Sequence, residues 1–386
     1  MTIPDSIKAL VPEAAEWRRD IHRHPELQYD VHRTAGKVAD LLRQFGCDEV
    51  VEGIGRTGVV GVIRGRPGTH TIGLRADMDA LPIEETTNLA YSSTVNGKMH
   101  ACGHDGHTAM LLGAAKNLAL TRNFAGKAVV IFQPAEEGGG GGKAMLDDGL
   151  MERFGIEEVY GLHNMPGLPP GHFAMRAGPM MASSDVFDIE ITGHGAHAAK
   201  PHAGVDPVLV AAHVITSLQT IVSRQTDPLK SAVISVTSIH AGEAYNVIPA
   251  SAHLRGTCRA LEPQIRDLIE RRLVEVSELT AKALGATATV SYKRGYPVTR
   301  NHALQLQFCA GIADRVAGKG NVDSNAPPVM GAEDFSYMLE ARPGAFVFIG
   351  NGDTAGLHNP AYDFNDAIIP AGISYWTQLT ETRLAG

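Results

Sequence analysis

The stretch MHACGHDGHTAML, at residues 99–111, contains a cysteine and three histidines that could do chemistry. They are His100, Cys102, His104 and His107, and an apolar, helix-like segment follows at once. These residue types can ligate a metal, can form a thiol nucleophile with its base, or can simply cap a helix. The stretch alone does not choose among the three possibilities, so the choice depends on what the rest of the chain brings to the same place.

Acidic residues and histidines also follow four apolar, strand-like runs elsewhere in the chain: Asp77 and Asp79, Glu136 and Glu137, His163, and His358. Reactive groups gather at the carboxyl ends of strands in open α/β sheets, so we expect these side chains to converge with the cysteine and histidines. A thiolate, imidazoles and carboxylates together suit Zn²⁺, with Mn²⁺, Co²⁺ or Ni²⁺ as alternatives. Two adjacent ions would take five residues as ligands, namely Cys102, His104, Glu137, His163 and His358. Glu136 would then remain as a general base for a metal-bound water.

The elements that must position these residues follow an α/β pattern. Short apolar runs alternate with helical segments over roughly the first 180 residues, which predicts a mostly parallel sheet. Near residue 180 the pattern changes to strand–helix–strand–strand–helix–strand, a split βαβ, ferredoxin-like layout. The α/β pattern then resumes. Helices are expected at about 6–23, 33–46, 104–120, 206–224 and 262–284.

This change of pattern predicts two domains, which also suits the length of 386 residues. The α/β domain would be formed by residues 1–181 and 295–386. Residues 182–294 would form an α+β domain inserted into it.

The composition is that of an ordinary soluble protein, with 44% hydrophobic and 20% charged residues and a net charge of −8. No run of lysine and arginine suggests nucleic-acid binding, and no apolar run is long enough for a membrane-spanning helix. The N-terminal segment lacks the features of a signal peptide. Cys47, Cys102, Cys258 and Cys309 show no paired spacing, so we expect free thiols in a cytoplasmic protein.

The glycine run in EEGGGGGK resembles a phosphate-binding loop at first sight. The P-loop pattern needs a glycine where Glu137 stands and a serine or threonine where Ala144 stands, so the pattern fails twice. We expect these glycines instead to let the backbone pass close to the metals.

Several motifs, in order along nearly the whole chain, resemble the M20 metallopeptidase family: RRDIHRHPEL, RADMDALPI, MHACGHDGHTAMLLGAA, FQPAEEGGGGGKAM, GLHNMPGLPPG, GHGAHAAKPHAGVDPV, NVIP and MGAEDFSYM. They are most similar to its amidohydrolase branch, which contains hippurate hydrolases, aminoacylases and auxin-conjugate hydrolases. The resemblance implies a catalytic α/β domain that holds two metals and an inserted domain that acts as a lid and in dimerisation. We therefore expect a homodimer or homotetramer.

The resemblance also implies roles for individual residues. Glu136 matches the general base that acts on a metal-bridging water. His197 of GHGAHAAKP matches a histidine that stabilises the oxyanion, often across the dimer. Asn246 and Arg259 match residues that bind the substrate carboxylate or polarise its carbonyl. The implied metal ligands are Cys102, as the bridge between the metals, with His104, Glu137, His163 and His358.

The chain departs from the wider family at two places. Many members carry His-x-Asp after the first strand and an aspartate as the bridge, whereas this chain has Asp77-x-Asp79 and Cys102. The departure fits the amidohydrolase branch and argues against a typical dipeptidase of the other branches. It leaves the roles of Asp77 and Asp79 open.

The sequence thus predicts metal-dependent hydrolysis of N-acyl amino acids, such as hippurate or N-acetyl amino acids, to a carboxylic acid and a free amino acid. One alternative is a metal-free cysteine hydrolase that uses Cys102, which would leave Glu137, His163 and His358 without a role. The other is a non-catalytic binding protein on the same fold, which we would expect to have lost the base or a ligand. Metal content distinguishes the first alternative, and turnover the second.

Overall fold

The structure, a computed structural model, describes residues 3–386. The described chain divides into two compact units, each with a hydrophobic core of its own. The first unit, unit 1, comprises the described residues up to Met180, together with Arg300–Pro327 and Asp334–Gly386. The second, unit 2, comprises Met181–Thr299 and Pro328–Glu333 and so interrupts unit 1 in the sequence.

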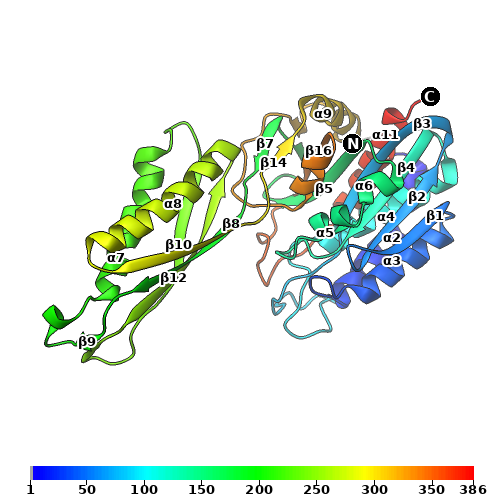
Figure 1. Cartoon of the computed structure of the whole chain (residues 1–386). Helices are drawn as coiled ribbons and strands as arrows, with labels where there is room; N and C mark the ends of the chain where they lie inside the picture. The colour runs from blue at the N-terminus through cyan, green and yellow to red at the C-terminus, as the bar shows by residue number, and fades with distance from the viewer. Residues whose placement is uncertain (1–2) are drawn as a thin grey trace. The chain divides into compact units, whose positions relative to one another are not determined.

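An eight-stranded sheet lies at the centre of unit 1 as the structure describes it (Figure 1). Its order is β1-β2-β4-β3-β5-β16-β6-β15. The four middle strands β4, β3, β5 and β16 run parallel, whereas β1 and β2 form an antiparallel arm at one edge. The mostly parallel sheet predicted from the sequence is therefore confirmed. The strands are β1 (Glu49–Ile54), β2 (Gly58–Arg64), β3 (Arg66–Asp77), β4 (Ala125–Gln133), β5 (Glu158–Pro166), β6 (Phe173–Ala174), β15 (Val322–Asp323) and β16 (Gly344–Gly352).

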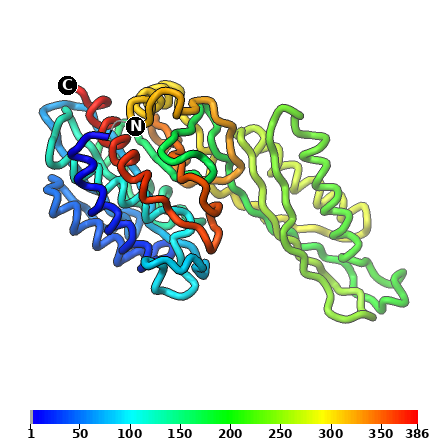
Figure 2. Tube along the Cα trace, turned by 180° about the vertical axis from the view of Figure 1, so that it is seen from behind, coloured from blue at the N-terminus to red at the C-terminus, as the bar shows by residue number. Residues whose placement is uncertain are grey.

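Helices cover this sheet, and α4 is buried on nearly all sides because it packs against β3, α2 and α11. Figure 2 shows α11, near the C-terminus, beside the first helices of the chain. The single helix expected at 6–23 is two helices. Pro12, which lacks an amide hydrogen, lies in the first turn of the second helix, where that hydrogen would have no partner within the helix. The helices of unit 1 are α1 (Asp5–Lys8), α2 (Val11–Arg23), α3 (His32–Gln44), α4 (His104–Thr121), α5 (Gly141–Asp147), α6 (Leu150–Phe154), α9 (Ala303–Ala317), α10 (Phe335–Ala341), η3 (Asp366–Ile368) and α11 (Ile369–Arg383).

Unit 2 contains a four-stranded antiparallel sheet of order β10-β12-β8-β13, with α7 and α8 packed on it (Figure 1). Alternate side chains of β8, such as Phe187, Ile189 and Ile191, are buried in the core that these helices share. The chain order and sheet order together are those of the predicted split βαβ layout. The elements are β8 (Asp185–Thr192), α7 (Pro207–Thr220), the π-helical turn η2 (Ile221–Gln225), β10 (Ala232–His240), β12 (Ser251–Ala260), α8 (Pro263–Ala283) and β13 (Thr287–Arg294).

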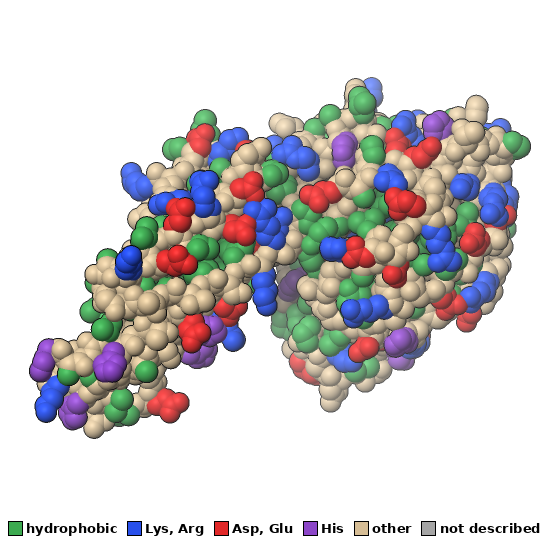
Figure 3. Space-filling model, in the orientation of Figure 1, with side chains coloured by type: hydrophobic (Ala, Val, Ile, Leu, Met, Phe, Trp, Pro, Cys, Tyr) green, Lys and Arg blue, Asp and Glu red, His purple; other side chains and the backbone are tan. Residues whose placement is uncertain are grey.

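Short elements complete the described chain. They are β7 (Gly178–Met181), which pairs with β14 (Thr299–Asn301), β9 (Ala196–His197), which pairs with β11 (Val247–Ile248), and the 3₁₀ turn η1 (Pro201–Ala203). On the face shown in Figure 3, lysine and arginine side chains are interspersed with aspartate and glutamate. Among the described helices, none combines the length and apolar character that crossing a bilayer requires.

Candidate metal centre

The parallel strands deliver the predicted residues to one edge of the sheet of unit 1. The strands β3, β4, β5 and β16 are parallel, so their carboxyl ends meet at the same edge, where α4 also begins. Asp79 follows β3, the Glu136–Glu137 pair follows β4, His163 lies within β5, and His358 follows β16.

All six residues predicted to form the metal site in unit 1 lie together in the structure. Their ligand atoms form three overlapping groups, within each of which the atoms lie no more than 4.8 Å apart. Cys102 belongs to two of these groups, so its sulfur lies between the two histidines of one group and the Glu137–His358 pair of the other. The groups are Cys102, His104 and His163; Cys102, Glu137 and His358; and His104, Glu136 and Glu137.

His104 and His163 are buried, and each places one ring nitrogen against a backbone carbonyl and the other toward the cluster. His104 Nδ1 lies 2.8 Å from the carbonyl oxygen of Asp79, and its buried Nε2 has no hydrogen-bond partner. His163 Nδ1 lies 2.7 Å from the carbonyl oxygen of Asn164, and its Nε2 lies 3.4 Å from the sulfur of Cys102. Histidines that ligate a metal usually donate their other nitrogen in this way. The residues present therefore fit a divalent metal ion.

The pKa values of Cys102 and His163 are shifted in the directions opposite to those of an activated cysteine–histidine pair. Burial raises the pKa of the Cys102 thiol well above its ordinary value, and the carboxylates of Glu137 and Glu136 raise it further. Burial, assisted by His107, lowers the pKa of His163 well below its ordinary value. A nucleophilic cysteine needs the opposite, a lowered pKa beside a cationic partner. A cation bound among these groups would favour the thiolate.

The carboxylate of Asp79 fixes the backbone of the two glutamates. Its Oδ1 accepts the amide of Glu136 at 2.9 Å and its Oδ2 accepts the amide of Glu137 at 3.0 Å. Because the carbonyl of Asp79 also lies against His104, this one residue contacts three members of the cluster. Although burial alone would lower the pKa of His104, the carboxylates of Asp77 and Asp79 raise it to about 10. The role that the sequence left open for Asp79 is therefore one of orientation.

Asp77 and His107 form a second buried layer beneath the cluster. His107 Nδ1 lies 2.6 Å from Asp77 Oδ1, and His107 Nε2 accepts the amide of Asn164 at 3.0 Å. Arg75 donates to Asp77 Oδ2 at 2.6 Å. Both nitrogens of His107 thus contact protein groups, while its ring centroid lies 4.4 Å from that of His163. Asn164 was not singled out from the sequence, although both its backbone and its side chain contact this layer: its Oδ1 lies 2.7 Å from His107 Nε2 and its Nδ2 donates to the Tyr362 hydroxyl at 2.6 Å.

Two residues at the cluster have strained backbones. His358 has φ 62° and Ala135, which precedes the glutamate pair, has φ 54°. Residues other than glycine adopt such angles only when their surroundings enforce them, and they concentrate at functional sites. The amide of His358 donates to the carbonyl of Ala101 at 2.8 Å, which ties its loop to the residue before Cys102.

The three remaining predicted residues lie in unit 2. His197 is exposed on β9, opposite Val247 of β11, and the amide of Ala198 donates to the carbonyl of Asn246 at 3.0 Å. His197 therefore lies in the small strand pair β9–β11, and Asn246 directly precedes β11. Arg259 is half-buried on β12 and donates to the carbonyl of Cys258 at 2.9 Å.

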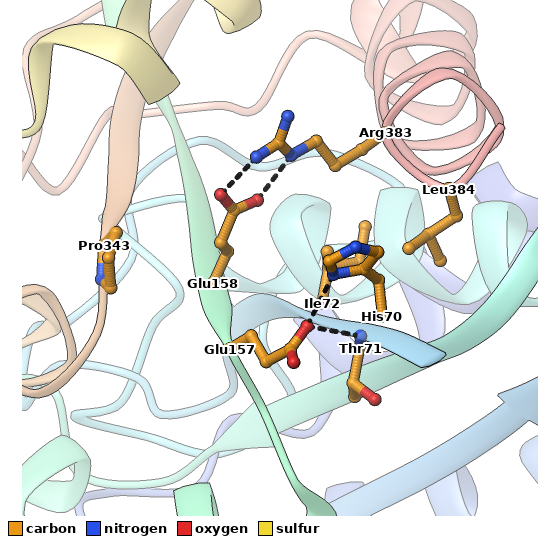
Figure 4. A pocket seen from close by; sticks show the side chains of 8 residues that line it. All are labelled: His70, Thr71, Ile72, Glu157, Glu158, Pro343, Arg383 and Leu384. Atoms are coloured by element: carbon orange, nitrogen blue, oxygen red, sulfur yellow. Dashed lines mark hydrogen bonds and ion pairs between the residues drawn. The ribbon is translucent and has the colours of Figure 1, made fainter. Parts of the chain in front are cut away.

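A cavity of about 370 Å³ lies at the opposite ends of the strands of unit 1 (Figure 4). Arg383 donates to Glu158 and His70 lies 2.9 Å from Glu157, so the charged groups in the wall are paired with one another. The cavity shares no residue with the cluster at the carboxyl ends, and it does not contribute to the candidate centre.

Comparisons with known proteins agree with this architecture. Residues 73–382 match the model of peptidase family M20/M25/M40. The chain is 43% identical over 379 residues to a hippurate hydrolase of Campylobacter jejuni, covering 98% of each protein. It is 39% identical to an N-acetyl-L-cysteine deacetylase of Bacillus subtilis, covering 99% of this chain and 90% of that protein.

A solved structure is similar over nearly the full length. The YXEP protein of Bacillus subtilis, described as a dinuclear metal binding peptidase of the M20 family, superposes with a TM-score of 0.86 at 34% identity and covers 98% of this chain and 99% of that one. The chain therefore belongs to peptidase family M20/M25/M40, as its motifs predicted. It is a hydrolase of amide bonds.

Proposed function

We propose that the chain hydrolyses the amide bond of N-acyl amino acids, with hippurate and N-acetyl amino acids as the leading substrates. Two divalent ions, zinc or manganese with cobalt or nickel as alternatives, would be held by Cys102, His104, Glu137, His163 and His358. The observation that carries the proposal is the convergence of these donors with Glu136 at one sheet edge, where His104 and His163 each turn one nitrogen to the cluster. The names of the relatives support the substrate class.

Bound divalent ions would supply positive charge that polarises an amide carbonyl and lowers the pKa of a water molecule. Glu136 would accept a proton from the attacking water and deliver it to the nitrogen as the carbon–nitrogen bond breaks. The products are a carboxylic acid and a free amino acid. Asp79 supports this role, because it holds the amides of both glutamates and so fixes the direction of the pair.

Unit 2 would complete the site as a lid and in dimerisation. His197 would donate to the oxygen of the scissile carbonyl, from a partner subunit of a homodimer or homotetramer. Its Nδ1 accepts the amide of Ala199 at 3.0 Å, which leaves Nε2 as the donor. Asn246 and Arg259 would bind the substrate carboxylate. The free thiols of the described cysteines suit the cytoplasm as the location.

The two alternatives predict different behaviour. A metal-free cysteine hydrolase would use Cys102 and keep its activity after treatment with a chelator. A binding protein on this fold would bind N-acyl amino acids and release no product.

The test is hydrolysis of a panel of N-acyl amino acids by chelator-stripped protein, with and without added Zn²⁺, Mn²⁺, Co²⁺ or Ni²⁺. The proposal expects activity that depends on metal, and full activity of the stripped protein would refute it.

Glu136→Gln should retain metal and lose turnover by about 10²–10⁴-fold. Glu152→Gln, on the surface of α6, is the matched control and should behave as the unchanged chain. Retained turnover in Glu136→Gln would remove Glu136 from the role of base.

A further inference from the structure

Residues 26–29 (ELQY), between α2 and α3, lie against both loops that carry the carboxylates of the centre. The amide of Ala80, which follows Asp79, donates to the carbonyl of Glu26 at 2.8 Å. Leu27 forms a parallel bridge with the same alanine. The amide of Ala135, which precedes Glu136, donates to the carbonyl of Gln28 at 3.1 Å. The segment therefore joins the ends of two neighbouring strands, β3 and β4, just beyond the point where their own pairing stops.

Two side chains of this segment hold the turn at residues 135–139, here called the glutamate turn. Gln28 donates from Nε2 to the carbonyl of Glu137, and the Tyr29 hydroxyl donates to the carbonyl of Gly139 at 2.8 Å. A Cβ at Gly139 would lie 2.3 Å from Gln28 Oε1 and 2.7 Å from the Cβ of Ala135, so a larger residue there would displace the Gln28 amide from its present place. Part of the glycine run is thus explained by contact with Gln28.

Several residues with strained backbones lie where the segment contacts the glutamate turn. Among the described residues, six other than glycine have a positive φ. Three of them meet here, namely Gln28 at 55°, Arg56 at 78° and Ala135 at 54°. The Arg56 guanidinium lies 4.1 Å from the ring centroid of Tyr29. Such strain persists where surrounding contacts enforce it, and its concentration beside a reactive group suggests a functional reason.

The glutamate turn does not need these side chains in order to close. The amide of Gly138 donates to the carbonyl of Glu136 at 2.6 Å, and the amide of Gly141 donates to the carbonyl of Ala135 at 3.1 Å. The turn is therefore formed by its own backbone. The bonds from Gln28 and Tyr29 fix instead where the turn points.

We propose that Gln28 and Tyr29 are positioning residues for hydrolysis, which hold the glutamate turn so that Glu136 and Glu137 face the metal centre. The inference rests on the proposed function for the roles of the two glutamates. Misplacing a reacting group by about 1 Å can cost 10²-fold in rate. Loss of a partner that orients a ligand typically costs 10–100-fold in metal affinity.

The test uses two variants and one control in the full chain. Gln28→Gly removes the amide while keeping a residue that adopts φ 55° without strain. Tyr29→Phe removes only the hydroxyl. Tyr160→Phe is the matched control, because its hydroxyl donates at 2.8 Å to Glu158, at the opposite strand ends. Three quantities are measured: Zn²⁺ affinity by competition with a chromogenic chelator, kcat and KM for the best substrate of the panel, and the midpoint of thermal unfolding.

We expect Gln28→Gly to bind Zn²⁺ about 10-fold more weakly and to lose kcat by about 10–100-fold, with KM within about twofold. Tyr29→Phe should show smaller losses of the same kind, and Tyr160→Phe neither. Wild-type Zn²⁺ affinity and kcat in both variants would overturn the inference, even if the unfolding midpoint fell, since the residues would then be merely structural. If the unchanged chain hydrolysed no substrate, the proposed function would fail, but Zn²⁺ affinity would still decide the role of Gln28 and Tyr29.

Discussion

Asp79→Asn should weaken metal binding and stability together. The Asp79 side chain is fully buried, and its two oxygens accept one amide each, from Glu136 and from Glu137. Asparagine keeps one acceptor oxygen and places an NH₂ group against the other amide, so that a donor faces a donor. The backbone carbonyl that contacts His104 is retained. The change therefore acts mainly on the glutamate pair, although it also removes the carboxylate charge that lies 3.5 Å from His104 Nδ1.

The size of the effect follows from the bonds that are lost. A hydrogen bond to a charged group contributes about 1.5–3 kcal/mol, and a buried amide left without an acceptor costs about 1–3 kcal/mol. We expect a loss of about 3–5 kcal/mol in the free energy of unfolding, which lowers the melting midpoint by roughly 10 °C. Metal affinity should fall by about 10–100-fold, because the pair that contains Glu137 is no longer held in place.

The assay is thermal unfolding of the metal-free protein together with chelator competition for Zn²⁺. Asp185→Asn is the control, since Asp185 is equally buried in unit 2 and accepts from Arg266 at 2.5 Å and from the Tyr292 hydroxyl at 2.8 Å. It should lose stability and keep metal affinity. Wild-type affinity in Asp79→Asn, or an equal loss of affinity in both variants, would refute the reasoning.

Four further outcomes are expected. Gly103→Ala should lower the metal content of the purified protein, because φ is 91° and a Cβ there would lie 2.3 Å from Asn164 Oδ1. Gly311→Ala in α9, where nothing lies within 4 Å, should instead stabilise the chain by about 0.5–1 kcal/mol in chemical denaturation. Restoring Zn²⁺ to stripped protein at 100 times its Kd should raise stability by about 2.7 kcal/mol, and an unmoved melting midpoint would argue against a site in the folded state. Burial alone would raise the pKa of Glu85, but its hydrogen bonds with His22 and the Ser93 amide lower it to about 2. The stabilisation by its charged form is complete above the ordinary pKa of 4.5 and is lost as the pH falls toward 2, so the acid unfolding curves of the stripped chain and of Glu85→Gln should converge over that interval.

The sequence reveals the strands that are buried on both faces. β4 and β16 are continuous apolar runs, and their composition alone predicts buried parallel strands. The edge strand β1 has a mostly exposed pattern and was missed, and the two-residue strands β9 and β11 are too short for any periodicity. A strand buried on both faces of the sheet has a recognisably apolar composition, whereas an edge strand or a two-residue strand does not.

The sequence predicted those residues of the candidate site whose type alone indicates metal binding. Cysteine, histidine and glutamate at strand ends indicate a metal site because few other uses require them together. Gln28 and Asn164 could not be found in this way, since glutamine and asparagine serve many purposes in proteins. Gln28 donates to a backbone carbonyl, and the Asn164 side chain contacts His107 and the Tyr362 hydroxyl. The sequence already left His107 out of the ligand set, and the structure adds its partners, Asp77 and Asn164. A residue that only supports its neighbours through hydrogen bonds cannot be recognised by its type.

The interruption of unit 1 by unit 2 has a consequence for the order of events during synthesis. His163 lies before unit 2 in the sequence and His358 lies after it, so roughly 200 residues are translated between them, which takes about 10–40 s at ordinary rates. Unit 2 has its own core, from residues that are all translated within this interval. A nascent chain thus carries four of the five proposed metal donors well before His358 exists. Metal delivered to the growing chain would meet an incomplete set of these proposed donors, and only a chain extended past His358 would offer all five.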